Sequence, residues 1–384
     1  MTNCSARKDS AASATSRISP TTFCASRRHG RSTRSRNRHF RYGDNIMTFP
    51  TPSRRRFVRL SAICAFGLAG LAATAAPVWA QDAAKYPERP VRLVVGYAPG
   101  GPTDILARVI GQEMGDALGQ PLVIENKPGA NGNIGTETVQ RAAPDGYSIL
   151  MNTISHNVNP LLQPNLVRYD PIKDFTPIAQ VAVLPQVIVV GPASAYKDLG
   201  ELLAKAKSNP GEVSFGSAGN GGSAHLAAAL LQQRSGTQMN HIPFRGNGPA
   251  LTEVIAGRVD FMFYPMIGLN ELVTGGKLRV LAVTTAERMP EYPDVPTTSE
   301  LGFTGFEDYA QPIGFIGPAG LPKDVTSKLQ ASIESALDKS EVQSRLKSLG
   351  AELTFRSAED YTTWLTQDRE RWADLIKSAD IRAE

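Results

Sequence analysis

The chain has 384 residues, a net charge of +5 and three cysteines, which together would suggest a basic protein with reactive thiols. The charge is unevenly placed: residues 1–60 hold 14 basic and two acidic residues, residues 61–80 hold none, and residues 81–384 hold 27 basic and 34 acidic residues, a net −7. All three cysteines precede residue 81. Residues 81–384 therefore offer no disulfide, no cysteine metal ligand and no thiol nucleophile.

Residues 47–80 show the pattern of an export signal. Four arginines lie in residues 54–59, residues 60–76 are apolar and uncharged, and Val78-Trp79-Ala80 is a small-x-small cleavage site. We expect cleavage after Ala80 and a periplasmic protein, exported by the Sec or the Tat route. A membrane anchor is disfavoured, because a span needs roughly 20 apolar residues.

Residues 1–46 are rich in Ser and Arg and precede this signal. We interpret them as a disordered leader, or as sequence upstream of a true start at Met47. A basic arm for nucleic acid is the alternative, but it would have to stay attached to an exported protein. We therefore expect no nucleic-acid partner.

Residues 81–384 alternate short β-type runs with helical patterns, which predicts an α/β protein with parallel sheets covered by helices. Strands are expected at 91–95, 121–125, 147–151, 178–190 with a break at Pro185, 213–216, 239–243, 259–263 and 278–283. Helices are expected at 102–118, from the turn 129–132 to 142, and at 199–208, 223–233, 249–256, 325–339, 341–349 and 358–378.

Two stretches, residues 97–104 and 217–225, share one arrangement: a strand, a glycine-rich loop and the start of a helix. The first helical turn has unpaired N–H groups and a partial positive charge, and glycine lets the backbone approach a ligand. Such loops can bind an anion without a charged side chain, and two of them suit a two-lobed protein that grips an anion. The alternative is that both are ordinary strand-to-helix turns.

Known catalytic motifs are missing from these loops. Ser223 does not lie in G-x-S-x-G, and Gly101 is followed by Pro102 where a phosphate-binding loop has Lys. Neither loop matches G-x-G-x-x-G. The sequence therefore favours binding over hydrolysis or nucleotide chemistry.

The histidines of residues 81–384 are His156, His225 and His241, and no two stand at metal-ligand spacing. We expect neither a metal nor a cofactor. His225 is expected in the first turn of its helix, binding ligand or capping backbone; the alternative is a base for Ser223. His156 is expected on a loop after the third strand, as a polar contact or a turn residue.

Two carboxylates have open roles. Asp104 is either an acid in the cleft or a first-turn carboxylate favoured by the helix dipole, and the sequence favours neither. Asp260 lies in an otherwise apolar predicted strand, where an unpaired carboxylate is costly to bury. It is either a strand-end residue near the cleft or an internal hydrogen-bond acceptor, and the second is favoured.

From residue 86 onward the chain resembles the Bug family, the periplasmic solute-binding receptors of tripartite tricarboxylate transporters. The resemblance rests on the order and spacing of short motifs: YPERPVR (86–92), PGGPTD (99–104), VIENKPGA (123–130), PDGY (144–147), GSAGNGGS (216–223), PFRG (243–246), GRVDFM (257–262) and DVPT (294–297).

The resemblance implies an α/β type II periplasmic-binding-protein fold, with two lobes of mixed or parallel sheet joined by two crossing segments near 184–190 and 302–311. Lobe 1 would hold residues 81–185 and 306–384, and lobe 2 residues 186–305. One departure from the family pattern is a missing aromatic residue near Gln311, which affects the pocket on that side.

The resemblance also implies which positions touch a ligand. They are Tyr97, Ala98, Pro99, Gly100, Gly101, Thr103, Asp104, Thr153, Ser155, His156, Ser217, Gly219, Asn220, Gly221, Ser223 and His225, with Arg245 and Asp260 as second-rank candidates.

We therefore expect a monomeric, non-enzymatic receptor for a small mono- or dicarboxylate that docks to membrane permease subunits. One alternative is a secreted enzyme on the same scaffold, with Ser223 and His225 or Asp104 as its chemical groups. Another is a receptor without a transporter that feeds a sensor.

Overall fold

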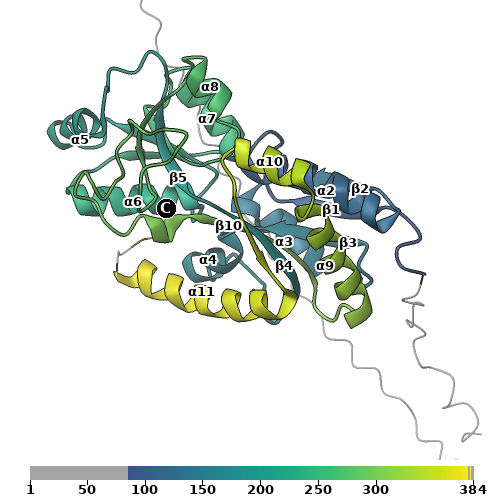
Figure 1. The fold of residues 1–384 in the computed structure, drawn as a ribbon. Helices are drawn as coiled ribbons and strands as arrows, with labels where there is room; N and C mark the ends of the chain where they lie inside the picture. Colours follow the sequence, from purple (N-terminus) through teal and green to yellow (C-terminus); the bar gives the residue numbers. More distant parts are fainter. Residues whose placement is uncertain (1–84, 379–380, 382–384) are drawn as a thin grey trace, which may run out of the picture. The chain divides into compact units, whose positions relative to one another are not determined.

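The computed structural model describes residues 85–378 and residue 381 (Figure 1). The expected leader, the export signal and the three cysteines lie outside these residues. Among the residues described, none of the helices combines the length and apolar character needed to cross a bilayer.

The first of two sheets has six strands in the order β11-β4-β10-β3-β1-β2. Its strands are β1 (Val91–Val95), β2 (Leu122–Asn126), β3 (Ser148–Asn152), β4 (Phe175–Leu184), β10 (Gln311–Pro318) and β11 (Glu352–Arg356). Strand β1 pairs in parallel with β2 and β3, whereas β10 is antiparallel to both β3 and β4. Helices of this lobe are α2 (Pro102–Leu118), α3 (Asn133–Gln140), α4 (Ser155–Leu162), α9 (Lys323–Leu337) and α10 (Ser340–Ser348).

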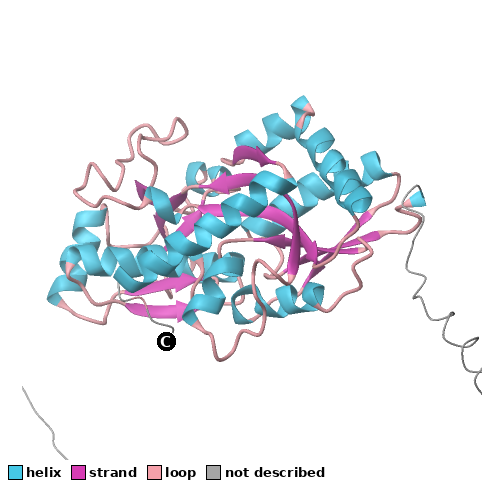
Figure 2. Cartoon of the chain, turned by 90° about the horizontal axis from the view of Figure 1, so that it is seen from below, coloured by secondary structure: helices cyan, strands magenta, loops and turns pink. Residues whose placement is uncertain are grey.

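The second sheet has five strands in the order β7-β6-β8-β5-β9. Its strands are β5 (Gln186–Val190), β6 (Ser214–Ser217), β7 (Asn240–Pro243), β8 (Phe261–Pro265) and β9 (Arg279–Val283). The helices between them are α5 (Leu199–Ser208), α6 (Ser223–Ser235), α7 (Asn247–Ile255) and α8 (Asn270–Thr274). Figure 2 shows helices on both sides of the strands, as expected of a layered α/β fold.

The chain crosses between the sheets at Pro185, which separates β4 from β5. Proline has no N–H for a ladder hydrogen bond, so an apolar run that could have formed one long strand divides there. The chain returns through the short helix η3 (Glu307–Tyr309) into β10. Gln186 Nε2 donates to the carbonyl of Tyr309 at 2.7 Å, which ties the two crossing segments together.

The last helix, α11 (Ala358–Ser378), contacts both halves of the fold. Near its start the Tyr361 hydroxyl is hydrogen-bonded to Asn152 of β3. Near its end Trp372 is fully buried in the apolar core of the five-stranded lobe, with its ring edge-on to Tyr309 at 5.1 Å. This helix spans the junction between the lobes.

Most strands and helices lie within two residues of the positions expected from sequence. The sheets are mixed, as the fold class allowed, because the crossing strands run antiparallel to their neighbours. One expectation was wrong: His156 lies in α4, where a loop was expected. Strands β10 and β11 and helix α8 were not anticipated.

Candidate ligand-binding site

The loop after β1 leads into a helix N-terminus without a side-chain cap. Gly100 has φ 82°, a left-handed conformation that suits glycine, and Gly101 is the N-cap of α2. Pro102 opens the helix, where its missing N–H costs nothing. The N–H groups of Thr103 and Asp104 have no helical carbonyl partner, so they can serve an anion.

Asp104 holds this loop in place. Its buried carboxylate accepts hydrogen bonds from Gly100 N, Asn126 Nδ2 and both Nε and Nη2 of Arg108, each at 2.9 Å. Burial raises the pKa of Asp104, but the bonds from Arg108, Gly100 and Asn126 outweigh it and bring the pKa below its ordinary value. Of the two roles left open by the sequence, these contacts fit the first-turn carboxylate.

The second glycine loop is shaped by two histidines. Ser217 Oγ lies 2.6 Å from Nε2 of His241, and Gly221 N donates to Nδ1 of His225 at 3.1 Å. The two imidazole rings stack with centroids 4.3 Å apart. Burial lowers the pKa of His241 to about 4, so this ring is neutral at pH 7. The loop ends at Gly222, the N-cap of α6, again without a side-chain cap.

A third uncapped helix start, that of α7, meets the first. Its N-cap Gly246 has φ 148°, which favours glycine, and a methyl group there would lie 3.1 Å from Ala98 N. A methyl group on Gly101 would lie 3.5 Å from Gly248 N. The N-terminus of α2 in one lobe therefore touches the N-terminus of α7 in the other.

A small enclosed cavity of about 10 Å³ lies at this meeting point. It is lined by Tyr97, Gly101, Pro102, Thr103, Asn247 and Gln311. The start of α6 is linked to the cavity through Gln311, whose Oε1 accepts a hydrogen bond from Ser223 Oγ of α6 at 3.0 Å. The space is about that of one water molecule.

Two buried polar atoms of this lining have no hydrogen-bond partner among the residues that the structure describes. They are Oδ1 of Asn247, whose residue is 7% exposed, and Nε2 of Gln311, whose residue is 5% exposed. Buried polar groups in native proteins are nearly always paired. An orphaned acceptor and an orphaned donor in one cavity therefore mark a place for a polar ligand.

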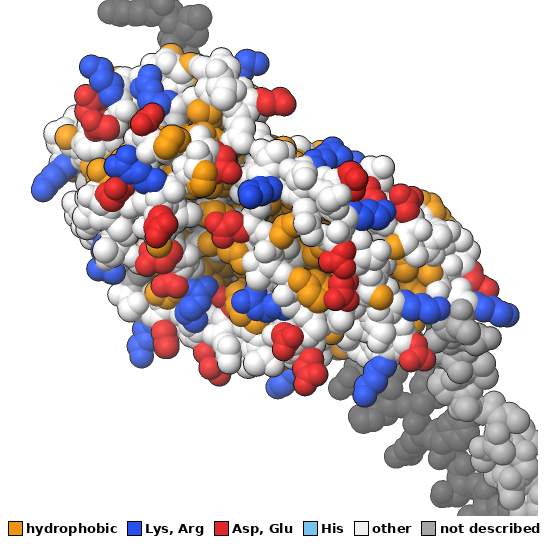
Figure 3. Space-filling view, in the orientation of Figure 1, with side chains coloured by type: hydrophobic (Ala, Val, Ile, Leu, Met, Phe, Trp, Pro, Cys, Tyr) orange, Lys and Arg blue, Asp and Glu red, His pale blue; other side chains and the backbone are white. Residues whose placement is uncertain are grey.

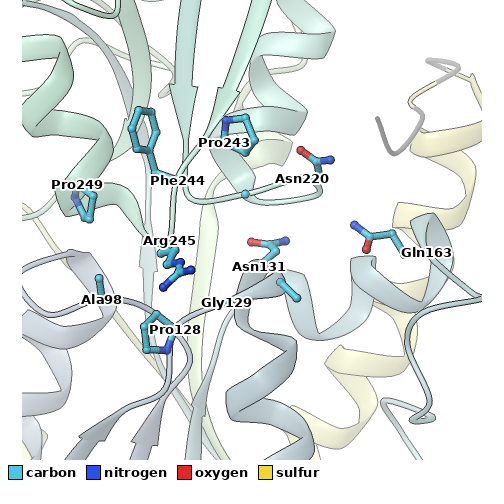
Figure 4. A pocket seen from close by; sticks show the side chains of 12 residues that line it. Ala98, Pro128, Gly129, Asn131, Gln163, Asn220, Pro243, Phe244, Arg245 and Pro249 are labelled. Carbon is cyan, nitrogen blue, oxygen red and sulfur yellow. The ribbon is translucent and has the colours of Figure 1, made fainter. Parts of the chain in front are cut away.

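An open groove of about 620 Å³ lies outside the enclosed cavity (Figure 4). Its lining includes Ala98, Asn131, Gly219, Asn220 and Arg245. Arg245 is the one ionisable side chain of that lining, is exposed, and forms no ion pair with any residue of 85–378. Figure 4 shows Arg245 and Asn131 facing the same opening, which gives the groove a positive and a polar wall.

Seven of the eighteen expected site residues line one of the two spaces. Tyr97, Gly101 and Thr103 line the enclosed cavity, and Ala98, Gly219, Asn220 and Arg245 line the groove. The hydroxyls of Thr153 and Ser155 lie 3.0 and 2.6 Å from that of Tyr97 and hold its ring. Burial raises the pKa of Tyr97, so its hydroxyl stays protonated.

Two expected residues have structural contacts of their own. His156 lines a small space beside Tyr97, Thr153 and Ser155. The ring of His156 is buried against Tyr169 and Phe175 and its Nε2 is bonded to the carbonyl of Pro171 at 2.8 Å. Asp260 lies beside the first residue of β6, Ser214, at the strand end opposite the glycine loop. It accepts bonds from Ser214 N and Oγ at 2.8 and 2.6 Å. That is the internal acceptor role favoured from sequence.

The sequence reasoning missed three amide side chains: Asn131, Asn247 and Gln311. Asn247 directly follows the PFRG motif at a helix start, which is a weak signal. Gln311 stood out only as a departure from an expected aromatic residue. Asn131 has φ 50° beside a glycine turn, and its carbon atoms lie against Gly219 of the other lobe.

The chain matches the family model described as "Tripartite tricarboxylate transporter family receptor" over residues 106–381. It is 34% identical to the protein BugT of Bordetella pertussis over 84% of this chain and 98% of that one. It is similar to MatC of Rhodopseudomonas palustris, solved with bound malate, at 34% identity and a TM-score of 0.72, covering 76% of this chain and all of that one. A second R. palustris protein, solved with adipate, matches at 30% identity and a TM-score of 0.74, covering 77% of this chain and 99% of that one.

Proposed function

We propose, from the premise that this chain belongs to the tripartite tricarboxylate transporter receptor family, that it captures a small mono- or dicarboxylate between its two lobes. The fold is the two-lobed type II periplasmic-binding-protein fold, and the family is one of solute-binding receptors. The relatives solved with malate and adipate support a carboxylate as the ligand here.

One observation carries this proposal: the starts of α2 and α7 meet at the enclosed cavity, and Ser223 at the start of α6 is hydrogen-bonded to Gln311 of its lining. Each helix start presents unpaired N–H groups and a partial positive charge of about half an elementary charge. A carboxylate placed there accepts hydrogen bonds from backbone N–H groups, the Thr103 hydroxyl and Gln311 Nε2.

The net negative charge of residues 81–384 does not oppose anion binding. Figure 3 shows acidic and basic side chains interspersed over the visible face. Exposed charges are screened over about 10 Å, whereas helix ends act at hydrogen-bond range. The attraction for an anion therefore comes from the nearby helix ends and does not depend on the net charge of the protein.

The mechanism we propose is closure around the ligand. With the lobes in contact, the enclosed cavity is far too small for a dicarboxylate, so the ligand enters only when the lobes separate. The lobes then close over the ligand less tightly than in this structure, and the ligand stabilises that closed form over the open one because it contacts both lobes. The closed form then docks to membrane permease subunits.

The remaining parts of the proposal concern cellular context. Residues 47–80 act as the export signal, by the Sec or Tat route, and the mature protein begins after Ala80 and works in the periplasm as a monomer. We assign residues 81–185 and 306–384 to one lobe and residues 186–305 to the other. Crossing at Pro185 and the composition of the two sheets support this division.

Differential scanning fluorimetry of the purified protein against a panel of small carboxylates tests the proposal. A true ligand at 100 times its Kd stabilises the folded state by about 2.7 kcal/mol. This raises the melting temperature by several degrees. Thr103→Val is expected to reduce that rise, whereas the control Thr362→Val, on exposed α11, leaves it unchanged. If no carboxylate in the panel shifts melting, the proposal is wrong.

A further inference from the structure

We infer that Asn247 and Gln311 make the site selective for carboxylates that carry a hydrogen-bond donor, a hydroxyl or an ammonium group, on the carbon next to the carboxylate. This inference rests on the proposed function and names the chemical class of its ligand. It is carried by the two orphaned side-chain atoms of the enclosed cavity.

Gln311 is oriented by a neighbour. Its Oε1 accepts the hydrogen bond from Ser223 Oγ at 3.0 Å, so its Nε2 is the atom left to donate. Gln311 lines the cavity together with residues at the starts of α2 and α7, and an amide N–H there is a suitable donor to a carboxylate oxygen. Gln311 therefore serves the carboxylate itself.

Asn247 presents the opposite chemistry. Its Oδ1 is an acceptor without a partner among residues 85–378, in a residue that is more than nine-tenths buried. An ionised carboxylate has only acceptor atoms, so it cannot satisfy Oδ1. A hydroxyl or ammonium group can, and a ligand without one leaves a buried acceptor unpaired, which is costly.

Because the cavity is small, the donor group that pairs with Asn247 and the carboxylate that pairs with Gln311 must lie close together on the ligand. Asn247 and Gln311 line the same space of about 10 Å³, between Gly101 and Thr103. When the lobes close on a ligand, the group that meets Asn247 must lie within one or two bonds of the carboxylate that meets Gln311. A substituent on the adjacent carbon fulfils this condition, so 2-hydroxy and 2-amino acids fit and unsubstituted acids do not.

Isothermal titration calorimetry with matched pairs of acids tests this inference. The probes are malate against succinate and lactate against propionate, each pair differing by one hydroxyl group. We expect the hydroxylated member of at least one pair to bind about 10-fold or more tightly than its partner. Equal affinities within every pair that binds would overturn the inference and leave the carboxylate function standing. Binding of an unsubstituted carboxylate, with every 2-hydroxy and 2-amino acid of a broad panel failing to bind, would also overturn the inference and leave the carboxylate function standing. If no carboxylate of any kind bound, the proposed function would fall as well.

Two variants test whether Asn247 is responsible for the preference for hydroxylated acids. Asn247→Ala is expected to reduce the preference for the hydroxylated acid to within about 3-fold, mainly by weakening its binding. Asn240→Ala removes the same side-chain type from an exposed position at the start of β7, at the strand end away from the glycine loop, and is expected to keep the preference. A preference that persists in Asn247→Ala would overturn the assignment. The comparison of acids on the unaltered protein decides the selectivity itself, even if a variant folds poorly.

Discussion

The backbone N–H of Ala98 donates to the carbonyl oxygen of Arg245 at 3.0 Å, a hydrogen bond between the two lobes. It joins the glycine loop before α2 to the segment before α7. Ala98 and Arg245 both line the open groove, and Tyr97, the residue before Ala98, lines the enclosed cavity. The bond therefore closes the site, and it must break for ligand to enter.

Gly246 makes this closing contact possible, so Gly246→Ala is expected to weaken ligand binding about 10-fold or more. The added methyl group would lie 3.1 Å from Ala98 N and would hold the lobes apart. The positive φ of this position adds a stability cost of about 1–2 kcal/mol.

Gly257→Ala is the matched control, because Gly257 also has positive φ but has nothing within 4 Å of the added methyl. Calorimetric titration and thermal melting should show lost stability in both variants and lost affinity only in Gly246→Ala. Equal affinities in the two variants would count against closure as the binding mechanism.

Arg245 is expected to accelerate ligand capture. It is exposed on the groove and forms no ion pair with the residues that the structure describes, so its charge is available to attract an anion. Arg245→Gln should lower the association rate constant a few-fold at low salt, with little change in dissociation. Stopped-flow measurement checks this, with Arg258→Gln, whose charge is paired with Glu253, as the control. An unchanged association rate would exclude a steering role.

Asp104→Asn is expected to cost about 1–2 kcal/mol of unfolding free energy and to weaken ligand binding. The carboxylate orders the loop through Gly100, and it also holds Arg108 and Asn126. Chemical denaturation and titration measure the two effects. Glu137→Gln breaks a similarly spaced but exposed pair with Arg141 and should cost less than about 0.5 kcal/mol. If Asp104→Asn lowered the unfolding free energy no more than Glu137→Gln does, the Asp104 carboxylate would not organise the loop.

The unfolding free energy is expected to fall as the pH drops from 6.5 toward 4. Burial lowers the pKa of His156 to about 4, against an ordinary value of 6.5, and does the same to His241. Between pH 6.5 and 4 these histidines are protonated in the unfolded chain but neutral in the folded chain. The stability they contribute is therefore present above pH 6.5 and is lost on acidification.

Each such histidine contributes about 1.4 kcal/mol per pH unit in that range. Urea denaturation at pH 7, 6 and 5 measures the slope. The variant His156→Phe, which keeps an aromatic ring between Tyr169 and Phe175, should reduce the slope by about one proton. An unchanged slope in this variant would show that His156 titrates normally.

The positions of β1 and α2 could be predicted because a β-branched run ends at glycines and is followed by a helical period. Strand β10 could not be, since Pro312, Gly314 and Gly317 interrupt its apolar pattern and only its pairing with β3 and β4 makes it a strand. The crossing at Pro185 was visible as a proline inside a long apolar run.

The residues of the site also fall into those that could be predicted from the sequence and those that could not. Both glycine loops were recognisable, because local sequence dictates a strand, a turn and a helix start. Asn247 and Gln311 were not, because each is a single amide whose role depends on tertiary contact between segments 64 residues apart. Similarly, the sequence placed His156 on a loop and could not show that Tyr169 and Phe175 enclose its ring.

A crystal structure of the protein with a carboxylate found in the melting panel tests the central claim most directly. We predict one carboxylate group within hydrogen-bond distance of Thr103 N and Gln311 Nε2, where the starts of α2 and α7 meet, with the lobes closed over it. A carboxylate bound only in the outer groove, or on a surface away from both glycine loops, would contradict the account.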